Sequence, residues 1–441
     1  MPTSGAGSIV GGLLIVFVAG CLNGSWNASF SPVWGLAVGR VNRQNRDRVD
    51  LDYHFAWVLF QIYGALVNIP ICLFWAGGPA RVHYVVSQSS AKSLALVILF
   101  SLLWGVGTVG FGLACRIAGV GLGTNLIMGV IMILGTFLPL CIEHVLATAA
   151  GGVIIAGLVL SCIGLYYSVK SLQTRDSDER KQKFMLAKVE QQDPIAHGFE
   201  AAAVQPTPGT NDTCSSVASG EGKQDEESGK RNEQIDMQTM AETDAVTVPA
   251  VSKVSDPCEM PSEAYSTWQK ISVCIVAGAF ASQLQFAFIF GDPIKSIASS
   301  DNGPGSTPSG GASAIIWLFA ISVSAPVSII YGLWQSPSDI PLSTMWRCPW
   351  YRHGLVLLTT SLPWICPIHL YGYSNTYLPA KLGASVAWPI LMMVTVIVGF
   401  LWSIVLGEWT YASTLARRQL KIGLALVALG VATIMASVAV Q

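Results

Sequence analysis

Amide and hydroxyl side chains interrupt the first long apolar stretch of this 441-residue chain, in the run CLNGSWNASFSP. They belong to Asn23, Ser25, Asn27 and Ser29. In hydrocarbon each unsatisfied polar group costs several kcal/mol, so these groups must bond to neighbouring helices or line a wet cavity. Spacings of two and four residues place part of the set on one helix face. Two interpretations remain: binding of a hydroxyl-rich substrate, or hydrogen bonds between helices.

The same kind of pattern returns 260 residues further along the chain. There Gln283 takes the place of Asn23, and Gln285 takes the place of Ser25. The same step pairs Trp57 with Trp317, Ser101-Leu102 with Ser361-Leu362, Trp104 with Trp364, Gly112 with Gly372, and Leu122-Gly123 with Leu382-Gly383. Both copies carry amides or hydroxyls at one depth, which favours a shared polar site.

Ten apolar segments are long enough to cross the roughly 30 Å hydrocarbon core of a bilayer as helices. Hydrophobic residues make up 52% of the chain and charged residues 12%, which indicates a membrane protein. The segments are 9–30, 53–76, 93–116, 122–142, 149–170, 268–290, 311–334, 353–373, 380–406 and 420–440. Five of them separate each residue from its repeat mate, and an odd number inverts the second copy. The predicted fold is therefore an all-α membrane protein of ten transmembrane helices, arranged as two inverted five-helix repeats.

A charged segment divides the two halves of the chain. Of 26 Asp and Glu residues, 18 lie within residues 173–266, which are rich in Ser, Gln, Thr and Pro. Such a composition buries too little apolar surface to offset its ordering entropy. We therefore predict a first repeat at 1–172, a disordered linker at 173–266 and a second repeat at 267–441. The stretch ERKQKFMLAKVE within the linker could instead extend the fifth helix.

The distribution of Lys and Arg predicts the orientation of the chain. The odd-numbered loops and the linker hold Arg40, Arg43, Arg46, Arg48, Arg116, Arg175, Arg180, Lys181, Lys183, Arg347, Arg352, Arg417, Arg418 and Lys421. The even-numbered loops and the termini offer Arg81, Lys92, Lys295 and Lys381. Positive loops stay inside, so we expect a cytoplasmic linker, both termini outside, and a place in the plasma membrane, or the inner membrane of a bacterium.

Two regions of the chain resemble the bacterial L-rhamnose-proton symporter family, a branch of the drug/metabolite transporter superfamily. The resemblance rests on Trp104-Gly105, Gly107, Gly112-Leu113, Arg116, Gly119, Gly123, Gly129, Gly135-Thr136 and Pro139, and on Trp388, Gly399 and Glu408-Trp409. It is clearest over residues 95–140 and 375–412. The resemblance implies ten helices in two inverted repeats of the drug/metabolite transporter fold, and uptake of a small sugar driven by protons.

Four aromatic residues are candidates for contact with a sugar ring: Trp26, Trp364, Tyr371 and Trp388. Their faces can pack against C–H groups, while indole N–H and phenol O–H groups make hydrogen bonds. The competing interpretation is an aromatic belt at the membrane surface. With Asn23, Ser25, Asn27, Gln283 and Gln285, they form the predicted substrate site.

Proton coupling needs a titratable group inside the membrane, and few are present. His369 lies in the eighth segment, Glu143 ends the fourth, Glu408 closes the ninth, and Asp292 follows the sixth. An intramembrane ionisable residue is a functional candidate by default. Histidine titrates near physiological pH, so we expect His369, with Glu143 and Glu408, to carry the proton. The alternative is that these are interfacial charges or a structural histidine.

The sequence therefore predicts a proton-coupled carrier of a small sugar that works by alternating access. One alternative is a carrier with the same fold that transports another polar metabolite. An alternative from another functional class is a membrane scaffold that acts through its linker. We find no nucleophile–base set or metal-ligand cluster, so neither an enzyme, a cofactor nor a metal site is predicted. A net charge of −1 gives no reason to expect nucleic acid. The fifth and tenth helices, which carry only small polar residues, would face the lipid bilayer or a second subunit in a homodimer.

Overall fold

The computed structural model describes residues 6–26, 53–118, 120–192, 265–300, 307, 310–335, 343, 346, 349–379, 382–407, 409–410 and 412–440. The chain divides into two compact units. Residues 1–182 and 260–441 form the first, which contains the spanning helices. Residues 183–259 form the second, of which the structure describes only the last turns of one helix. Residues 193–264, the larger part of the linker predicted at 173–266, lie outside the described residues.

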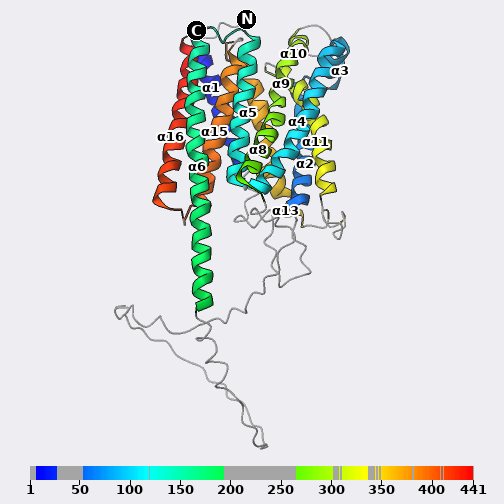
Figure 1. Cartoon of the computed structure of the whole chain (residues 1–441). Coiled ribbons are helices and arrows are strands. Elements are labelled where there is room, and N and C mark those ends of the chain that lie inside the picture. Colours follow the sequence, from blue (N-terminus) through cyan, green and yellow to red (C-terminus); the bar gives the residue numbers. More distant parts are fainter. Residues whose placement is uncertain are drawn as a thin grey trace, which may run out of the picture. The chain divides into compact units, whose positions relative to one another are not determined.

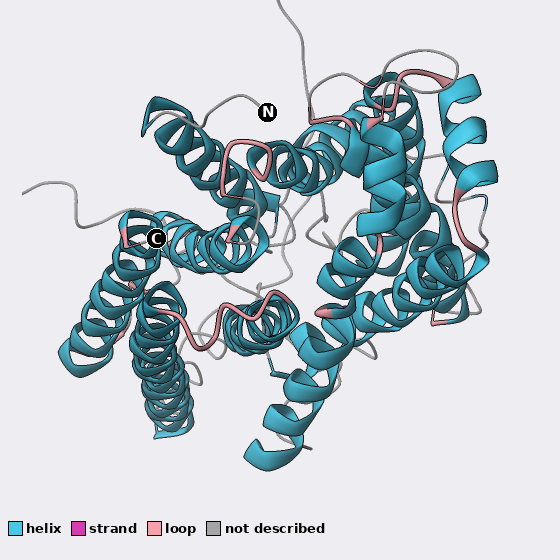
Figure 2. Cartoon of the chain, turned by 90° about the horizontal axis from the view of Figure 1, so that it is seen from above, coloured by secondary structure: helices cyan, strands magenta, loops and turns pink. Residues whose placement is uncertain are grey.

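Ten helices of the described chain are long and apolar enough to cross a membrane. The described residues contain no β-strand (Figure 2). The prediction of an all-α membrane protein with ten spanning helices is thereby confirmed. In chain order the spans are α1 (Ala6–Ser25), α2 (Tyr53–Trp75), α4 (Ala91–Ala118), α5 (Val120–Ile142), α6 (Ala149–Gln192), α8 (Thr267–Ala281) with α9 (Gln283–Phe290), α11 (Ala312–Trp334), α13 (Trp350–Val356) with the π-helical η4 (Leu357–Ser361) and α14 (Leu362–Ser374), α15 (Gly383–Val405), and α16 (Thr414–Ala436).

The structure adds detail that hydropathy did not predict. Two short helices, α3 (Pro79–Gln88) and α10 (Asp292–Ser299), follow the second and sixth spans. Helix α6 continues as far as Gln192, so the first part of the predicted linker is helical. Helix α16 begins six residues before the predicted start of the tenth span, because Ser413 caps it by accepting a hydrogen bond from the Ala416 amide.

The two ends of the helix bundle can be distinguished in Figure 1. Helix α1 begins and α16 ends at one end, which we call the terminal end; α3 and α10 also lie there. Helix α8 begins at the opposite end, which we call the linker end, and α13 lies at that end.

The spanning helices approach one another closely where glycine replaces a side chain. At Gly107 of α4, a Cβ would collide with the backbone of Ala281 at the end of α8. At Gly24 of α1, a Cβ would lie 2.7 Å from the Thr395 carbonyl oxygen of α15. Association in lipid depends on such packing, because the lipid tails are as apolar as the helices.

A small separate core holds the short helices at the terminal end. It includes Val85 of α3, Val97 of α4 and Ile294 of α10. Arg81 of α3 is fully buried and donates hydrogen bonds to the carbonyls of Ala298 and Ser300, at and just beyond the last turn of α10. A cation at a helix C-terminus is favourable because it meets unpaired carbonyls and the negative end of the dipole.

Helices α6 and α16 pack on each other through their small residues. A Cβ at Gly157 would lie 2.9 Å from the Gly430 carbonyl oxygen, and a Cβ at Gly164 would lie 2.7 Å from that of Gly423. The small-residue faces are therefore used within the chain. A homodimer through the fifth and tenth helices, which stays a prediction, would have to use their other faces.

We expect Gly164→Val to destabilise the protein, because the added methyl groups would force α6 away from α16. Overpacking of this kind costs about 1–3 kcal/mol. Gly152→Val is the matched control on the same helix, since a Cβ there has nothing within 4 Å. The apparent melting temperature of the purified protein in detergent measures both. Equal melting temperatures for the two variants would contradict the tight α6–α16 contact.

Candidate functional site

A cavity of about 80 Å³ lies inside the bundle. Seven of the ten spans line it: α1, α2, α4, α5, the α8–α9 span, α14 and α15. Its lining includes no Asp, Glu, Lys, Arg or His among the described residues. The cavity is smaller than the roughly 300–1,000 Å³ of typical ligand pockets.

Seven of the 18 residues that line the cavity are aromatic. Trp26, just after α1, stacks on Phe60 of α2 with ring centroids 5.4 Å apart. Trp104 of α4 stacks on Trp364 of α14 at 5.7 Å, with their planes 18° apart. Phe60 also meets Trp364 edge-on at 5.0 Å, which joins the two stacks into one surface. Such a surface offers flat apolar faces to a ligand.

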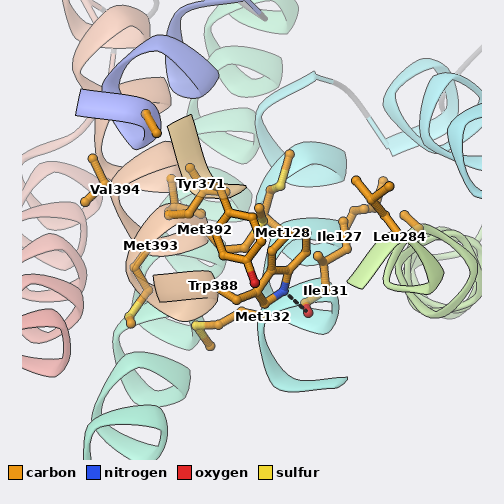
Figure 3. Packing of buried hydrophobic residues seen from close by; sticks show 14 of the residues in the cluster. Ile127, Met128, Ile131, Met132, Leu284, Tyr371, Trp388, Met392, Met393 and Val394 are labelled. Atoms are coloured by element: carbon orange, nitrogen blue, oxygen red, sulfur yellow. Dashed lines mark hydrogen bonds between the residues drawn. The ribbon is translucent and has the colours of Figure 1, made fainter. Parts of the chain in front are cut away.

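Trp388 of α15 forms another part of the wall and is firmly held (Figure 3). Its indole N–H donates to the Ile131 carbonyl of α5 at 3.2 Å. Gly135 makes this approach possible, because a Cβ there would collide with the Trp388 ring. Tyr371 of α14 packs edge-on against Trp388, with centroids 5.4 Å apart.

Two amides provide hydrogen-bonding groups in this aromatic setting. Asn23 lines the cavity and donates from Nδ2 to the Thr395 hydroxyl at 2.9 Å. Gln61 of α2 also lines it and is 1% exposed. Its Nε2 finds no hydrogen-bond acceptor among the described residues. A buried amide without a partner is costly, so Gln61 is suited to bind a polar ligand.

The predicted substrate residues are only partly brought together. Asn23, Trp26, Trp364 and Trp388 line the cavity, and Asn27 lies outside the described residues.

The other predicted residues bond to protein groups and do not line the cavity. The Ser25 hydroxyl donates to the Cys21 carbonyl and accepts from the indole of Trp402. Gln283 donates to the Ala279 carbonyl of its own span. The Gln285 amide pairs with the Tyr371 hydroxyl, 2.7 Å from its nitrogen and 2.9 Å from its oxygen. For these groups the structure favours the alternative of hydrogen bonding within and between helices.

Of the predicted proton-coupling groups, His369 is the one buried next to the cavity. It follows the cavity-lining Ile368 and is 8% exposed. Its Nε2 lies 3.0 Å from Oδ1 of Asn68. Because Asn68 donates from Nδ2 to the Trp317 carbonyl at 3.1 Å, its oxygen faces the histidine. His369 thus links α14 through Asn68 to α11.

The structure describes one of the two predicted carboxylates. Glu143 is in the turn after α5, and Glu408 is outside the described residues. Asp292 pairs with Lys295 at 2.5 Å in α10. Burial lowers the pKa of Lys295, and the charges of Asp292 and Glu143 counteract this effect. These carboxylates at the terminal end balance a lysine and do not face the cavity.

Gln61 and Asn68 were missed by the sequence analysis. Both are single amides in the apolar run AWVLFQIYGALVN of the second span. An isolated amide at membrane depth was the available signal, and it is the signal that had singled out the first span.

This chain is similar to several curated proteins that are described as L-rhamnose-proton symporters. An L-rhamnose-proton symporter of Mannheimia succiniciproducens is 32% identical over 73 residues, which are 16% of this chain and 21% of that protein. The corresponding proteins of Klebsiella pneumoniae and Escherichia coli are 29% identical over 151 residues and 27% over 121. These matches cover 31% and 26% of this chain, and 42% and 33% of the relatives' lengths. No family model matches the chain, and no solved structure does.

Proposed function

We propose that this protein is a secondary active transporter that takes up a small neutral sugar, similar to L-rhamnose, together with protons. Transport would proceed by alternating access between two inverted five-helix halves of the drug/metabolite transporter type. The observation that carries the proposal is the aromatic cavity, whose described lining is uncharged and includes a buried amide nitrogen, Nε2 of Gln61, without an acceptor among the described residues.

The chemistry of the cavity suits a neutral sugar. Stacked indoles offer faces for the C–H edges of a ring, and Asn23 and Gln61 offer amide donors and acceptors for hydroxyls. A phosphorylated substrate would need cations, which the described lining lacks. The names of the similar curated proteins support the same class of cargo.

Equivalent contacts in the two halves support the inverted repeat. Trp57 packs 3.7 Å from where a Cβ of Gly112 would lie, and Trp317 packs 3.0 Å from where a Cβ of Gly372 would lie. These are repeat mates, and so are Trp104 and Trp364, which stack on each other between the halves.

The pairing of whole helices follows the same relation. Helix α4 packs on α8, and its counterpart α14 packs on α1. Helix α15 packs on α1, and its counterpart α5 packs on α8. Each half thus packs its helices against those of the other half. Two similar halves that meet in this way can tilt against each other, which would open the cavity to one end and then to the other.

His369 would couple the proton to this movement. The neutral ring shares its Nε2 hydrogen with Asn68, whereas a protonated ring would carry a charge in a buried, apolar setting. A buried charge of this kind favours a conformation in which water reaches the ring or an opposite charge pairs with it. Protonation at His369 would therefore bias the bundle toward opening near α14.

Orientation is part of the proposal. The linker end would face the cytoplasm, and the terminal end would face the outside. This orientation is supported by the positively charged residues near the linker end, because such residues favour the cytoplasmic side: Lys170, Arg417, Arg418 and Lys421.

The proposal is tested with purified protein in liposomes under an imposed pH gradient. A panel of labelled neutral sugars, with L-rhamnose among them, is offered alongside nucleotide sugars and amino acids. We expect gradient-dependent uptake of one or a few neutral sugars. Uptake of another class of metabolite would change the cargo, and no uptake of any compound would remove the transport function.

The Gln61→Leu variant should bind the sugar more weakly because it loses an amide whose nitrogen has no acceptor among the described residues. A lost hydrogen bond of about 1 kcal/mol corresponds to about a five-fold higher KM for uptake. Gln283→Leu is the matched control, since that amide bonds to its own span. Equal KM values for the two variants would contradict the placement of the site.

The His369→Gln variant should separate transport from its driving force. Glutamine can keep a hydrogen bond to Asn68 but cannot be protonated near neutral pH. We expect gradient-driven accumulation to be lost while exchange of labelled for unlabelled sugar across the liposome membrane continues. His83→Gln, at an exposed position of α3, is the control. Normal accumulation by His369→Gln would exclude this histidine as the coupling group.

A further inference from the structure

A second hollow lies on the outside of the bundle, away from the sugar cavity. It is a groove of about 430 Å³ between α5, α6 and the start of α8. One part of its lining is apolar and includes Val130, Ile133 and Leu165; the other part is polar and includes Lys170 and Gln173. The two parts follow each other along the helices, so the groove is amphipathic along its length.

The polar part lies at the depth of a membrane surface. Lys170 comes 21 residues after the start of α6 at Ala149. At 1.5 Å per residue this is about 31 Å, which matches the roughly 30 Å of a hydrocarbon core. The start of α8 supplies Ile271 to the groove at this same end. Ile133 and Cys162 lie about two to three turns deeper. The groove therefore runs from the linker-side surface toward the middle of the membrane.

The charge at the surface end is positive, and no described carboxylate pairs with it. The Lys170 ammonium is exposed and has no hydrogen bond or ion pair within the part of the chain that the structure describes. The next carboxylates along α6 have partners: Asp176 pairs with Arg175 at 3.0 Å, and Asp178 accepts from the Ser413 amide at 3.3 Å. Lys270 precedes Ile271 in α8 at the same end of the bundle and is not among the lining residues.

We propose that this groove binds one anionic phospholipid from the leaflet at the linker end. An acyl chain would lie along Val130, Ile133 and Leu165, and the head-group phosphate would meet Lys170, with Gln173 as a further donor. Basic pockets between spanning helices hold lipid head groups in this way. The proposal does not depend on the transported substrate, because the groove and the sugar cavity share no lining residue.

A lipid fits the groove better than the other occupants do. The predicted linker is acidic but rich in Ser, Gln and Pro, so it has little to place against the apolar half. A second copy of the chain would bring its own Lys170 or other basic residues to a positive end. A phospholipid alone combines one negative charge with a long apolar chain at the observed spacing.

Native mass spectrometry of the full-length protein tests the proposal. The protein is titrated with phosphatidylserine, phosphatidylcholine or inorganic phosphate, and retained lipids are counted. We expect one phosphatidylserine to be retained more tightly than phosphatidylcholine. Lys170→Gln should weaken the binding of phosphatidylserine about five-fold, the effect of one lysine at a membrane surface. Cys162→Phe, which fills the apolar half, should weaken both lipids.

Lys181→Gln is the matched control, because this exposed lysine lies on the same helix face three turns beyond Lys170. It should bind phosphatidylserine like the unchanged protein. Equal affinities for Lys170→Gln and the unchanged protein would overturn the proposal, as would equal losses in the two lysine variants.

Competition by inorganic phosphate alone would indicate a simple anion site. Tighter lipid binding after deletion of residues 195–255 would identify the linker as the occupant, and a dimer dissociated by Cys162→Phe would identify a second copy.

Discussion

Spanning helices gain little from hiding apolar surface from one another in lipid, so this bundle depends on close fit. Glycine provides it where helices of the two halves cross, as at Gly107 against Ala281 and at Gly278 against Val130. Gly135 does the same for a side chain by admitting the ring of Trp388.

Several buried polar groups follow the companion rule that a polar group in the membrane should find a partner. Asn23 meets Thr395, Gln285 meets Tyr371, and Asn68 lies between Trp317 and His369. The amide nitrogen of Gln61 is one of several buried polar atoms without a hydrogen-bond partner among the described residues, and Gln61 lines the cavity. A ligand hydroxyl in the cavity would therefore be favourable for this amide.

The spans could be predicted because hydropathy over twenty residues measures what the bilayer requires. The rotation of each helix about its axis could not be predicted. Apolar residues surround most of these helices, so no polar face indicates which side of a helix points to the cavity. Gln285 and Trp364 were therefore predicted alike, yet one pairs with Tyr371 and the other lines the cavity. The short helices α3 and α10 were missed because each is too short for a hydropathy signal. Their stability comes from tertiary contacts such as those of buried Arg81.

The position of His369 relative to the cavity constrains how coupling would work. In α14 it lies five residues nearer the terminal end than the cavity-lining Trp364, which is about 7 Å along the helix. A proton arriving from the terminal end would reach His369 before the sugar site, and a sugar would pass the same region. Pro367 lies between them and weakens the helix at that point by removing a backbone donor. Protonation and sugar entry would therefore act on one segment of α14, so that a single local movement can sense both.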